Sequence, residues 1–150
     1  MTVHTYESTL SWEGSTGTGY RAYGRAHDVQ VADEIITLSA DAAFRGDASL
    51  PNPEQLLLAA ASSCLLLSFL AVAAQAGVDV IRYEDAARAH MPMDQQPARI
   101  TRVELSPRIT VRSADAEAVT ALLHQAHEGC YIANSMTAEA VIEPTVEVIA

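Results

Sequence analysis

The chain has 150 residues, which suffices for one domain with a sizeable core, and its 49% hydrophobic content argues against disorder. A formal net charge of −10 speaks against nucleic acid or an anionic membrane surface as the main partner. All nine basic residues are arginines, so the absence of lysine excludes Schiff-base lysine chemistry and a P-loop.

Three strands are predicted ahead of the first helix. Residues 3–12 alternate in polarity, residues 20–31 form a second extended segment, and residues 35–39 a third. The glycine-rich segment 14–19 between the first two predicts a turn and therefore an N-terminal hairpin. A loop follows over residues 41–51.

A long apolar helix is predicted from Pro53 to about residue 76. Asn52 is a good N-cap, Gln55 completes a pattern like a capping box, and Gly77 is a typical C-terminal stop. Residues 55–78 carry no charge and are long enough to span a bilayer. Their many small side chains and the lack of flanking basic clusters favour instead a helix buried on every side. Because one small domain cannot cover such a helix, we expect a partner subunit to complete the burial.

The second half alternates strands with one further helix. Residues 78–91 are predicted as a long strand, and residues 100–112 as another, in which Pro107 favours an edge or a bulge. Ser113 is expected to cap a second helix, and residues 139–149 form a closing strand. This order of strands and helices predicts a single α+β domain over residues 1–150. The apolar stripe of the second helix continues to Cys130.

Cys64 and Cys130 are the only cysteines, and each lies at a distinctive point of a predicted helix. Cys64 is in the middle of the long apolar helix, and Cys130 follows Gly129 at the end of the second. The N-terminus has neither a basic region nor an apolar core, so a cytoplasmic location is expected. Since a permanent disulfide is disfavoured in that reducing compartment, the two thiols are interpreted as a transient redox pair.

A reactive Cys64 would need a nearby cation, because apolar burial alone raises the pKa of a thiol. The candidates are Arg45 in the loop before the helix and Arg21 or Arg25 in the hairpin. Glu54 is the obvious carboxylate to orient that guanidinium. It precedes Cys64 by about 15 Å along a straight helix. The two side chains can share one pocket only if the helix start bends, if an arginine bridges them, or if Glu54 serves a neighbouring subunit, and we take the last as a hypothesis. Cys130, at a helix C-terminus, suits a resolving role.

Simpler interpretations remain open. A cysteine in an Ala/Leu helix is usually an unreactive small hydrophobe, and Glu54 at a helix start can simply complement the dipole. Arg45 can form a surface pair with Asp47. His124, His127 and Cys130 drift around their helix and lack a fourth ligand, so no metal site is expected.

The motifs resemble the OsmC/Ohr family, the osmotically inducible protein C and organic hydroperoxide resistance proteins. The matching residues are N-P-E-Q-L at 52–56, A-A-A-S-S-C at 59–64, H-E-G-C-Y at 127–131 and W-E-G at 12–14. The likeness is strongest to a less characterised branch. It implies an OsmC/Ohr-like fold and an intertwined homodimer whose antiparallel-rich sheets wrap two long central helices.

The resemblance also implies a function in oxidative-stress defence. A thiol-dependent peroxidase would reduce organic hydroperoxides with Cys64 as peroxidatic and Cys130 as resolving cysteine. Glu54 would pair with the essential arginine, for which Arg45 is slightly favoured over Arg25. The reductant would be a thiol such as a dihydrolipoyl group, with no metal or organic cofactor. The alternative is a noncatalytic OsmC-like dimer that binds an apolar ligand or stress metabolite.

Overall fold

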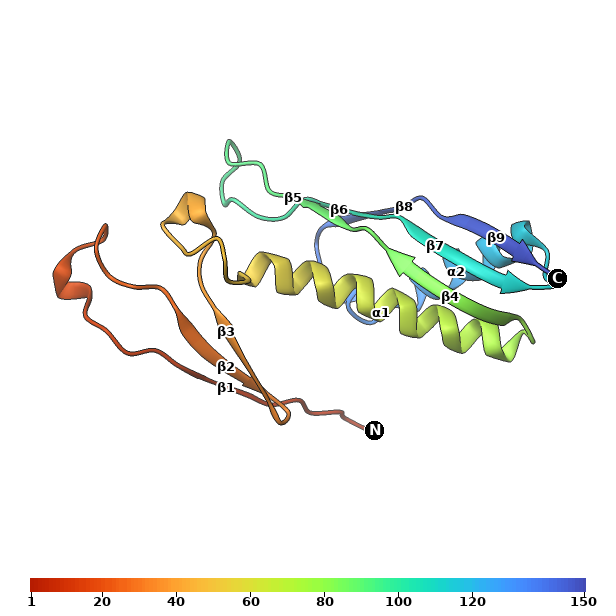
Figure 1. Cartoon of the computed structure of the whole chain (residues 1–150), viewed down its shortest axis with the longest axis horizontal. Helices are drawn as coiled ribbons and strands as arrows, with labels where there is room; N and C mark the ends of the chain where they lie inside the picture. Colours follow the sequence, from red (N-terminus) through yellow and green to blue (C-terminus); the bar gives the residue numbers. More distant parts are fainter. The chain divides into compact units, whose positions relative to one another are not determined.

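The computed structural model describes all residues from Met1 to Ala150. The chain forms two compact units, Met1–Leu56 and Leu57–Ala150, which we call the first and the second unit. One continuous helix, α1 (Pro53–Gln75), begins in the first unit and continues in the second (Figure 1). The expectation of a single domain over residues 1–150 therefore stays a prediction.

The first unit contains a three-stranded antiparallel sheet in the order β1-β2-β3. Its strands are β1 (Ser8–Ser11), β2 (His27–Val31) and β3 (Glu34–Leu38). The first two are much shorter than the sequence predicts. Residues 20–26 are not extended, because a turn begins at Gly19, whose φ is 95°. The Gly19 carbonyl accepts hydrogen bonds from the Ala22 and Tyr23 amides. This turn places Arg25 outside the sheet.

The ends of α1 are formed by the residues that the sequence indicates. The Gln55 amide donates to Asn52 Oδ1 at 2.9 Å, and the Asn52 amide donates to Gln55 Oε1 at 3.0 Å, which is a complete capping box. At the other end Gly77 is left-handed, with φ 73°. The Val78 amide donates to Ala73 and that of Gly77 to Ala74, the two bonds of a Schellman motif.

Within one chain, α1 buries only one narrow stripe. Its fully buried residues recur every four positions, which is one helix face: Ala61, Leu65, Phe69 and Ala73. Leu57, Leu67 and Leu70 remain 38% to 64% exposed. The expectation of a helix buried on every side is thus not met by a single chain. By length and composition alone α1 could also cross a membrane, a test that core helices of soluble proteins pass too.

The second unit contains two three-stranded sheets, in the orders β4-β7-β9 and β5-β6-β8. Each of the three long strands predicted here is broken, and its two halves enter different sheets. The two halves of the first broken strand are β4 (Asp79–Asp85) and β5 (Arg88–His90). Those of the second are β6 (Arg102–Leu105) and β7 (Pro107–Arg112), and those of the third are β8 (Glu139–Ile142) and β9 (Thr145–Ile149). In both sheets the middle strand pairs antiparallel on one side and parallel on the other.

Two prolines and one aspartate accompany these breaks. Pro107 begins β7 and Pro144 lies between β8 and β9, positions where the missing N–H costs no ladder bond. The expectation of an edge position for Pro107 is wrong, because β7 is the middle strand of its sheet. Asp85, at the end of β4, accepts from the Ser106 amide at 2.7 Å and from the Ser62 hydroxyl, which joins α1 to the break.

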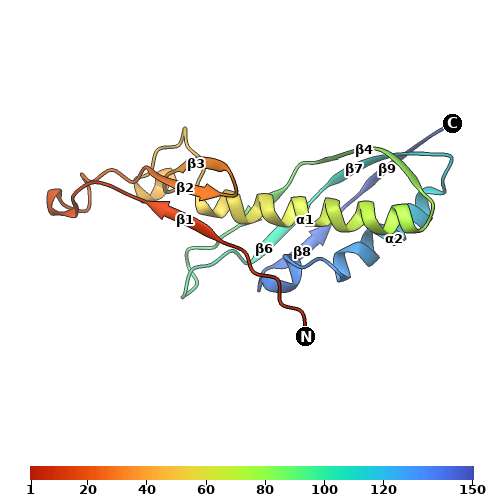
Figure 2. The same ribbon diagram turned by 90° about the horizontal axis from the view of Figure 1, so that it is seen from below.

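Helix α2 (Ala116–Glu128) is capped by Asp115 rather than by Ser113. The Asp115 carboxylate accepts from the Ala118 amide at 2.9 Å. Ser113 is instead left-handed, with φ 49°, and its amide donates to the carbonyl of Ile149. The buried stripe of α2 joins that of α1 and the two sheets in one core, and the ribbon places α2 beside the C-terminal part of α1 (Figure 2). The predicted α+β class is confirmed.

Candidate active site

The two cysteines meet in the second unit. Cys64 is half-buried on the flank of the buried α1 stripe, and Cys130 is 1% exposed just after α2. Both are free thiols, and the Cys130 side chain hydrogen-bonds the Cys64 sulfur. The pairing of a central helix with the end of a second helix, which the sequence suggests, is therefore present in the fold. It arises because Cys130 continues the buried face of Val119, Leu123 and Ala126.

A tight turn after α2 fixes the position of Cys130. The Cys130 amide donates to His127 O at 3.1 Å, and its carbonyl accepts from the Asn134 amide at 3.0 Å. The Asn134 side chain donates to Glu128 O, and the Ser135 hydroxyl to Tyr131 O at 2.7 Å. These bonds begin the short 3₁₀ helix η3 (Ala133–Ser135). The first amides of such a helix have no intrahelical acceptor, so they are free to serve another group.

The backbone amides of Tyr131 and Ile132, just before η3, and of Ala133, its first residue, bond to the two cysteine sulfurs. Burial by itself raises the pKa of the Cys64 thiol. Hydrogen bonds from the Ile132 amide, the Cys130 thiol, the Tyr131 amide and the Ser68 hydroxyl outweigh it and hold this pKa below its ordinary value. Backbone donors thus favour the thiolate without any cation from the second unit. Sequence reasoning missed them, because a backbone amide carries no residue-specific signal.

The pKa of the Cys130 thiol is shifted in the opposite direction, above its ordinary value. Burial raises the pKa of the Cys130 thiol most, and the neighbouring Cys64 sulfur raises it further, while the Ala133 and Ile132 amides act against this. Cys130 therefore keeps its proton when Cys64 has lost its own. A cysteine with a lowered pKa beside a protonated cysteine suits thiol redox chemistry, in which the first sulfur attacks an oxidant and the second then attacks the oxidised sulfur.

A cavity of about 470 Å³ opens beside Cys64. Its wall combines the side chains of Leu67, Ala71 and Val72 from α1 with Ala126 and Tyr131 from α2 and the turn. Leu67 is 64% and Tyr131 81% exposed, so both lie at the surface. No arginine lines this cavity. The reactive sulfur thus faces a mostly apolar space.

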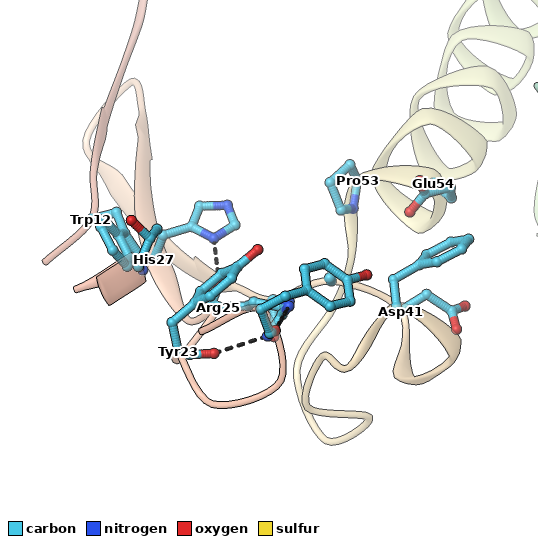
Figure 3. A pocket seen from close by; sticks show the side chains of 12 residues that line it. Trp12, Tyr23, Arg25, His27, Asp41, Pro53 and Glu54 are labelled. Carbon is cyan, nitrogen blue, oxygen red and sulfur yellow. Dashed lines mark hydrogen bonds between the residues drawn. The ribbon is translucent and has the colours of Figure 1, made fainter. Parts of the chain in front are cut away.

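The first unit contains a second cavity, of about 520 Å³, around Arg25. The guanidinium donates from Nη1 to Tyr23 O at 2.9 Å and from Nη2 to Tyr20 O at 2.7 Å. It also lies 3.9 Å from the ring centroid of Tyr23 and 5.0 Å from that of Tyr20. In Figure 3 Arg25 lies between Trp12 and His27 on one side and Asp41 and Glu54 on the other. Sequence reasoning missed this aromatic setting.

The arginine candidates differ in their surroundings. Arg25 shares its cavity with Glu54, whereas Arg45 and Arg21 line neither cavity. Arg45 is exposed and left-handed, with φ 66°, at the end of the short 3₁₀ helix η2 (Ala42–Phe44). It forms no ion pair with Asp47, whose carboxylate accepts from Ser49 instead. Among residues 1–56, the structure therefore brings Arg25 and Glu54 together.

His124 and His127 do not extend the thiol pair into a metal centre. No group of three or more His, Cys, Asp or Glu side chains gathers closely enough to hold an ion. Both histidines lie on α2, and neither lines the cavity beside Cys64.

The chain combines an α+β fold with a long helix, α1, whose Cys64 lies beside the Cys130 thiol that follows α2. The chain belongs to the OsmC-like protein family, whose model matches residues 46–145. A comparison with functionally curated proteins finds no match.

Solved structures support the same fold. An OsmC-like protein of unknown function from Vibrio cholerae is 25% identical, with a TM-score of 0.81 over 98% of this chain and 100% of that one. An organic hydroperoxide resistance protein OsmC from Legionella pneumophila is 17% identical, with a TM-score of 0.69 over 99% and 100%. An organic hydroperoxide resistance protein from Elizabethkingia anophelis is 17% identical, with a TM-score of 0.67 over 99% of both chains. The OsmC/Ohr-like fold is thereby confirmed.

Proposed function

We propose that the protein is a thiol-dependent peroxidase that reduces organic hydroperoxides in oxidative-stress defence. The observation that carries this proposal is the polarised thiol pair. Cys64 has a lowered pKa and a cavity in front of it, while the buried Cys130, with a raised pKa, donates to its sulfur. The names of the solved relatives that are organic hydroperoxide resistance proteins support the same reading.

The first chemical step oxidises Cys64. Its thiolate attacks the terminal oxygen of R–O–O–H, an S–O bond forms, and the O–O bond breaks. The products are Cys64 sulfenic acid and the alkoxide R–O⁻, which takes a proton from solvent and leaves as the alcohol. The apolar wall beside Cys64 favours an organic R group over the bare hydrogen of hydrogen peroxide.

The second step closes the pair. The Cys130 sulfur attacks the sulfenic sulfur of Cys64, and the hydroxyl group leaves with the thiol proton as water. The resulting disulfide needs two electrons and two protons, which an external dithiol such as a dihydrolipoyl group supplies as it becomes a disulfide itself. Because the Cys130 thiol is already close enough to the Cys64 sulfur to lower its pKa, no long approach has to precede this step.

A homodimer would complete the site. The exposed leucines of α1, Leu57, Leu67 and Leu70, provide an apolar surface that a second copy can cover. We propose that Arg25 and Glu54 of one protomer serve Cys64 of its partner, with the guanidinium stabilising negative charge on the peroxide oxygens. The assignment to Arg25 rather than Arg45 rests on the cavity that Arg25 shares with Glu54.

The test is peroxide consumption under turnover. The reduced protein is mixed with cumene hydroperoxide and a dithiol such as dihydrolipoamide, and both peroxide and free thiols are followed. We expect catalytic loss of peroxide and, without the dithiol, rapid loss of both free thiols. Millimolar peroxide that leaves both thiols intact would contradict the proposal and favour a noncatalytic role.

A further inference from the structure

Aromatic side chains are scarce in this chain, yet half of them surround one cavity. The sequence holds five Tyr, two Phe and one Trp. Four of these, Trp12, Tyr20, Tyr23 and Phe44, line the 520 Å³ cavity around Arg25. The cavity beside Cys64 has a single aromatic residue, Tyr131. The Arg25 cavity therefore offers ring faces and edges, which favour a planar aromatic group over a saturated one of the same size.

The charges of this cavity narrow the class of ligand. An aromatic cage usually attracts an organic cation, but here the Arg25 guanidinium already covers one face of Tyr20 and one face of Tyr23. Its guanidinium has five N–H groups, of which two donate to the Tyr20 and Tyr23 carbonyls. The remaining N–H groups are available to an acceptor on the ligand. A cationic ligand would meet repulsion from the same group.

The opposite wall disfavours an anion. Asp41 and Glu54 place two carboxylates on the lining, and each repels a carboxylate ligand. They can instead accept a hydrogen bond from a hydroxyl group. His27 donates its Nδ1 proton to Arg25 O at 2.8 Å, which leaves Nε2 as a further acceptor. A neutral group that both donates and accepts, such as a hydroperoxide or an alcohol, fits both walls.

We propose that the Arg25 cavity binds neutral molecules that combine an aromatic ring with a hydroxyl or hydroperoxide group. Resting on the proposed peroxidase function, this names aryl-alkyl hydroperoxides as the preferred substrate class. The ligand ring lies among the four aromatic side chains of the lining, Trp12, Tyr20, Tyr23 and Phe44. The oxygen atoms lie between the Arg25 guanidinium and the Glu54 carboxylate. The inference about binding needs no chemistry at Cys64.

Trp12 makes the binding test direct, because it is the only tryptophan and forms part of the cavity wall. Three probes are titrated into the Cys64→Ser protein while Trp12 fluorescence is recorded: 2-phenylpropan-2-ol, its cyclohexyl counterpart and 2-phenylpropanoate. We expect saturable binding of the aryl alcohol, roughly three- to tenfold tighter than the cyclohexyl alcohol, and weaker binding of the carboxylate. Equal affinity for aryl and cyclohexyl alcohols, or no saturable change, would overturn the proposal.

Variants locate the binding. Tyr20 is 63% exposed, so the Tyr20→Leu variant should fold, which circular dichroism checks. Its affinity for the aryl alcohol should be several-fold weaker than that of the parent. Tyr20→Phe keeps the ring and should bind as the parent does. Tyr6→Leu is the matched control, because Tyr6 is 89% exposed in the same unit and lies outside the lining of the Arg25 cavity. If Tyr20→Leu binds like Tyr6→Leu, the proposed site is wrong.

The same experiment separates the two proposals. Binding of the aryl alcohol without any oxidation of Cys64 by cumene hydroperoxide would contradict the peroxidase and keep the cavity assignment. Reduction of cumene and cyclohexyl hydroperoxides with equal kcat/KM, and equal binding of both alcohols, would keep the peroxidase and overturn the aromatic preference.

Discussion

The Cys130 thiol donates a hydrogen bond to the sulfur of Cys64, and the pKa values of the two thiols are shifted in opposite directions: that of Cys64 is lowered and that of Cys130 is raised. The donor is buried in the core and the acceptor faces a cavity. In this arrangement Cys64 ionises before Cys130, and it does so in the absence of substrate.

Loss of the Cys130 donor should move the titration of Cys64. In the parent, hydrogen bonding keeps the Cys64 pKa below its ordinary value, so the reactive thiolate persists to lower pH than in a free cysteine. Cys130→Ala removes one donor, and the pH midpoint of alkylation by iodoacetamide should rise. Cys130→Ser offers a hydroxyl donor and should keep the midpoint lower than Cys130→Ala. Identical pH profiles of the two variants would contradict the assigned hydrogen bond.

Arg25 and Arg45 should differ in their effect on the peroxide reaction. If Arg25 stabilises the charge on the peroxide oxygens, Arg25→Ala should slow the oxidation of Cys64 on the order of 100-fold. Arg45→Ala removes an exposed side chain that lines neither cavity, so the rate should stay within about twofold. Stopped-flow measurement with cumene hydroperoxide checks both rates. A larger loss in Arg45→Ala would reverse the assignment.

Tyr83 carries a buried hydroxyl without a hydrogen-bond partner. Its ring packs on Phe69, with centroids 5.9 Å apart. Tyr83→Phe keeps that contact and removes an unsatisfied polar atom, so stability should be unchanged or rise by about 1 kcal/mol. Urea unfolding at neutral pH measures the difference. A clear loss of stability would mean that the hydroxyl has a partner in solution.

Tyr83 should also make the stability of the folded chain depend on pH in the alkaline range. Burial raises the pKa of the Tyr83 phenol most, and the negative charges of Asp85 and Cys130 add to it. In the unfolded chain this phenol ionises near pH 10, whereas the folded chain keeps it protonated. The free energy of unfolding is therefore unaffected by the phenol below that pH and decreases as the pH rises above it. Tyr83→Phe should therefore lose less stability than the parent between about pH 9 and pH 11. Parallel stability curves for the two proteins would exclude the shift.

Gly46 lies where no side chain fits. A Cβ atom at this position would lie 1.6 Å from the carbonyl oxygen of Ala40. Gly46→Ala must displace backbone beside the Arg25 cavity, so we expect a loss of about 3 kcal/mol or more. Gly24→Ala is the matched control in the same unit, since its Cβ would meet nothing within 4 Å. Thermal unfolding compares the two, and equal melting temperatures would show that the close approach is absent.

The sequence predicts the parts of this fold that depend on local chemistry. Asn52 and Gln55 form a capping box, and Gly77 ends α1, because the atoms involved lie within a few residues of one another. The stripe of α2 that carries Cys130 into the core follows from its helical period. These signals need no knowledge of the rest of the chain.

The missed features depend on tertiary contacts. The break after β6 involves Asp85, which is distant in sequence and accepts from the Ser106 amide. The donors to the Cys64 sulfur are backbone amides of Tyr131 and Ile132, whose direction is set by the turn after α2. The position of Arg25 follows from a turn that continues from Gly19 into residues 20–23, which the sequence pattern predicts as part of a strand.

In the proposed reaction the sulfur of Cys64, and not that of Cys130, attacks the peroxide. The reduced protein is treated with less than one equivalent of cumene hydroperoxide in the presence of dimedone, in the parent and in Cys130→Ser, and the labelled peptides are mapped by mass spectrometry. We expect the sulfenic acid adduct on Cys64 in Cys130→Ser, and a Cys64–Cys130 disulfide in the parent. An adduct on Cys130, or no adduct and no disulfide, would contradict the account.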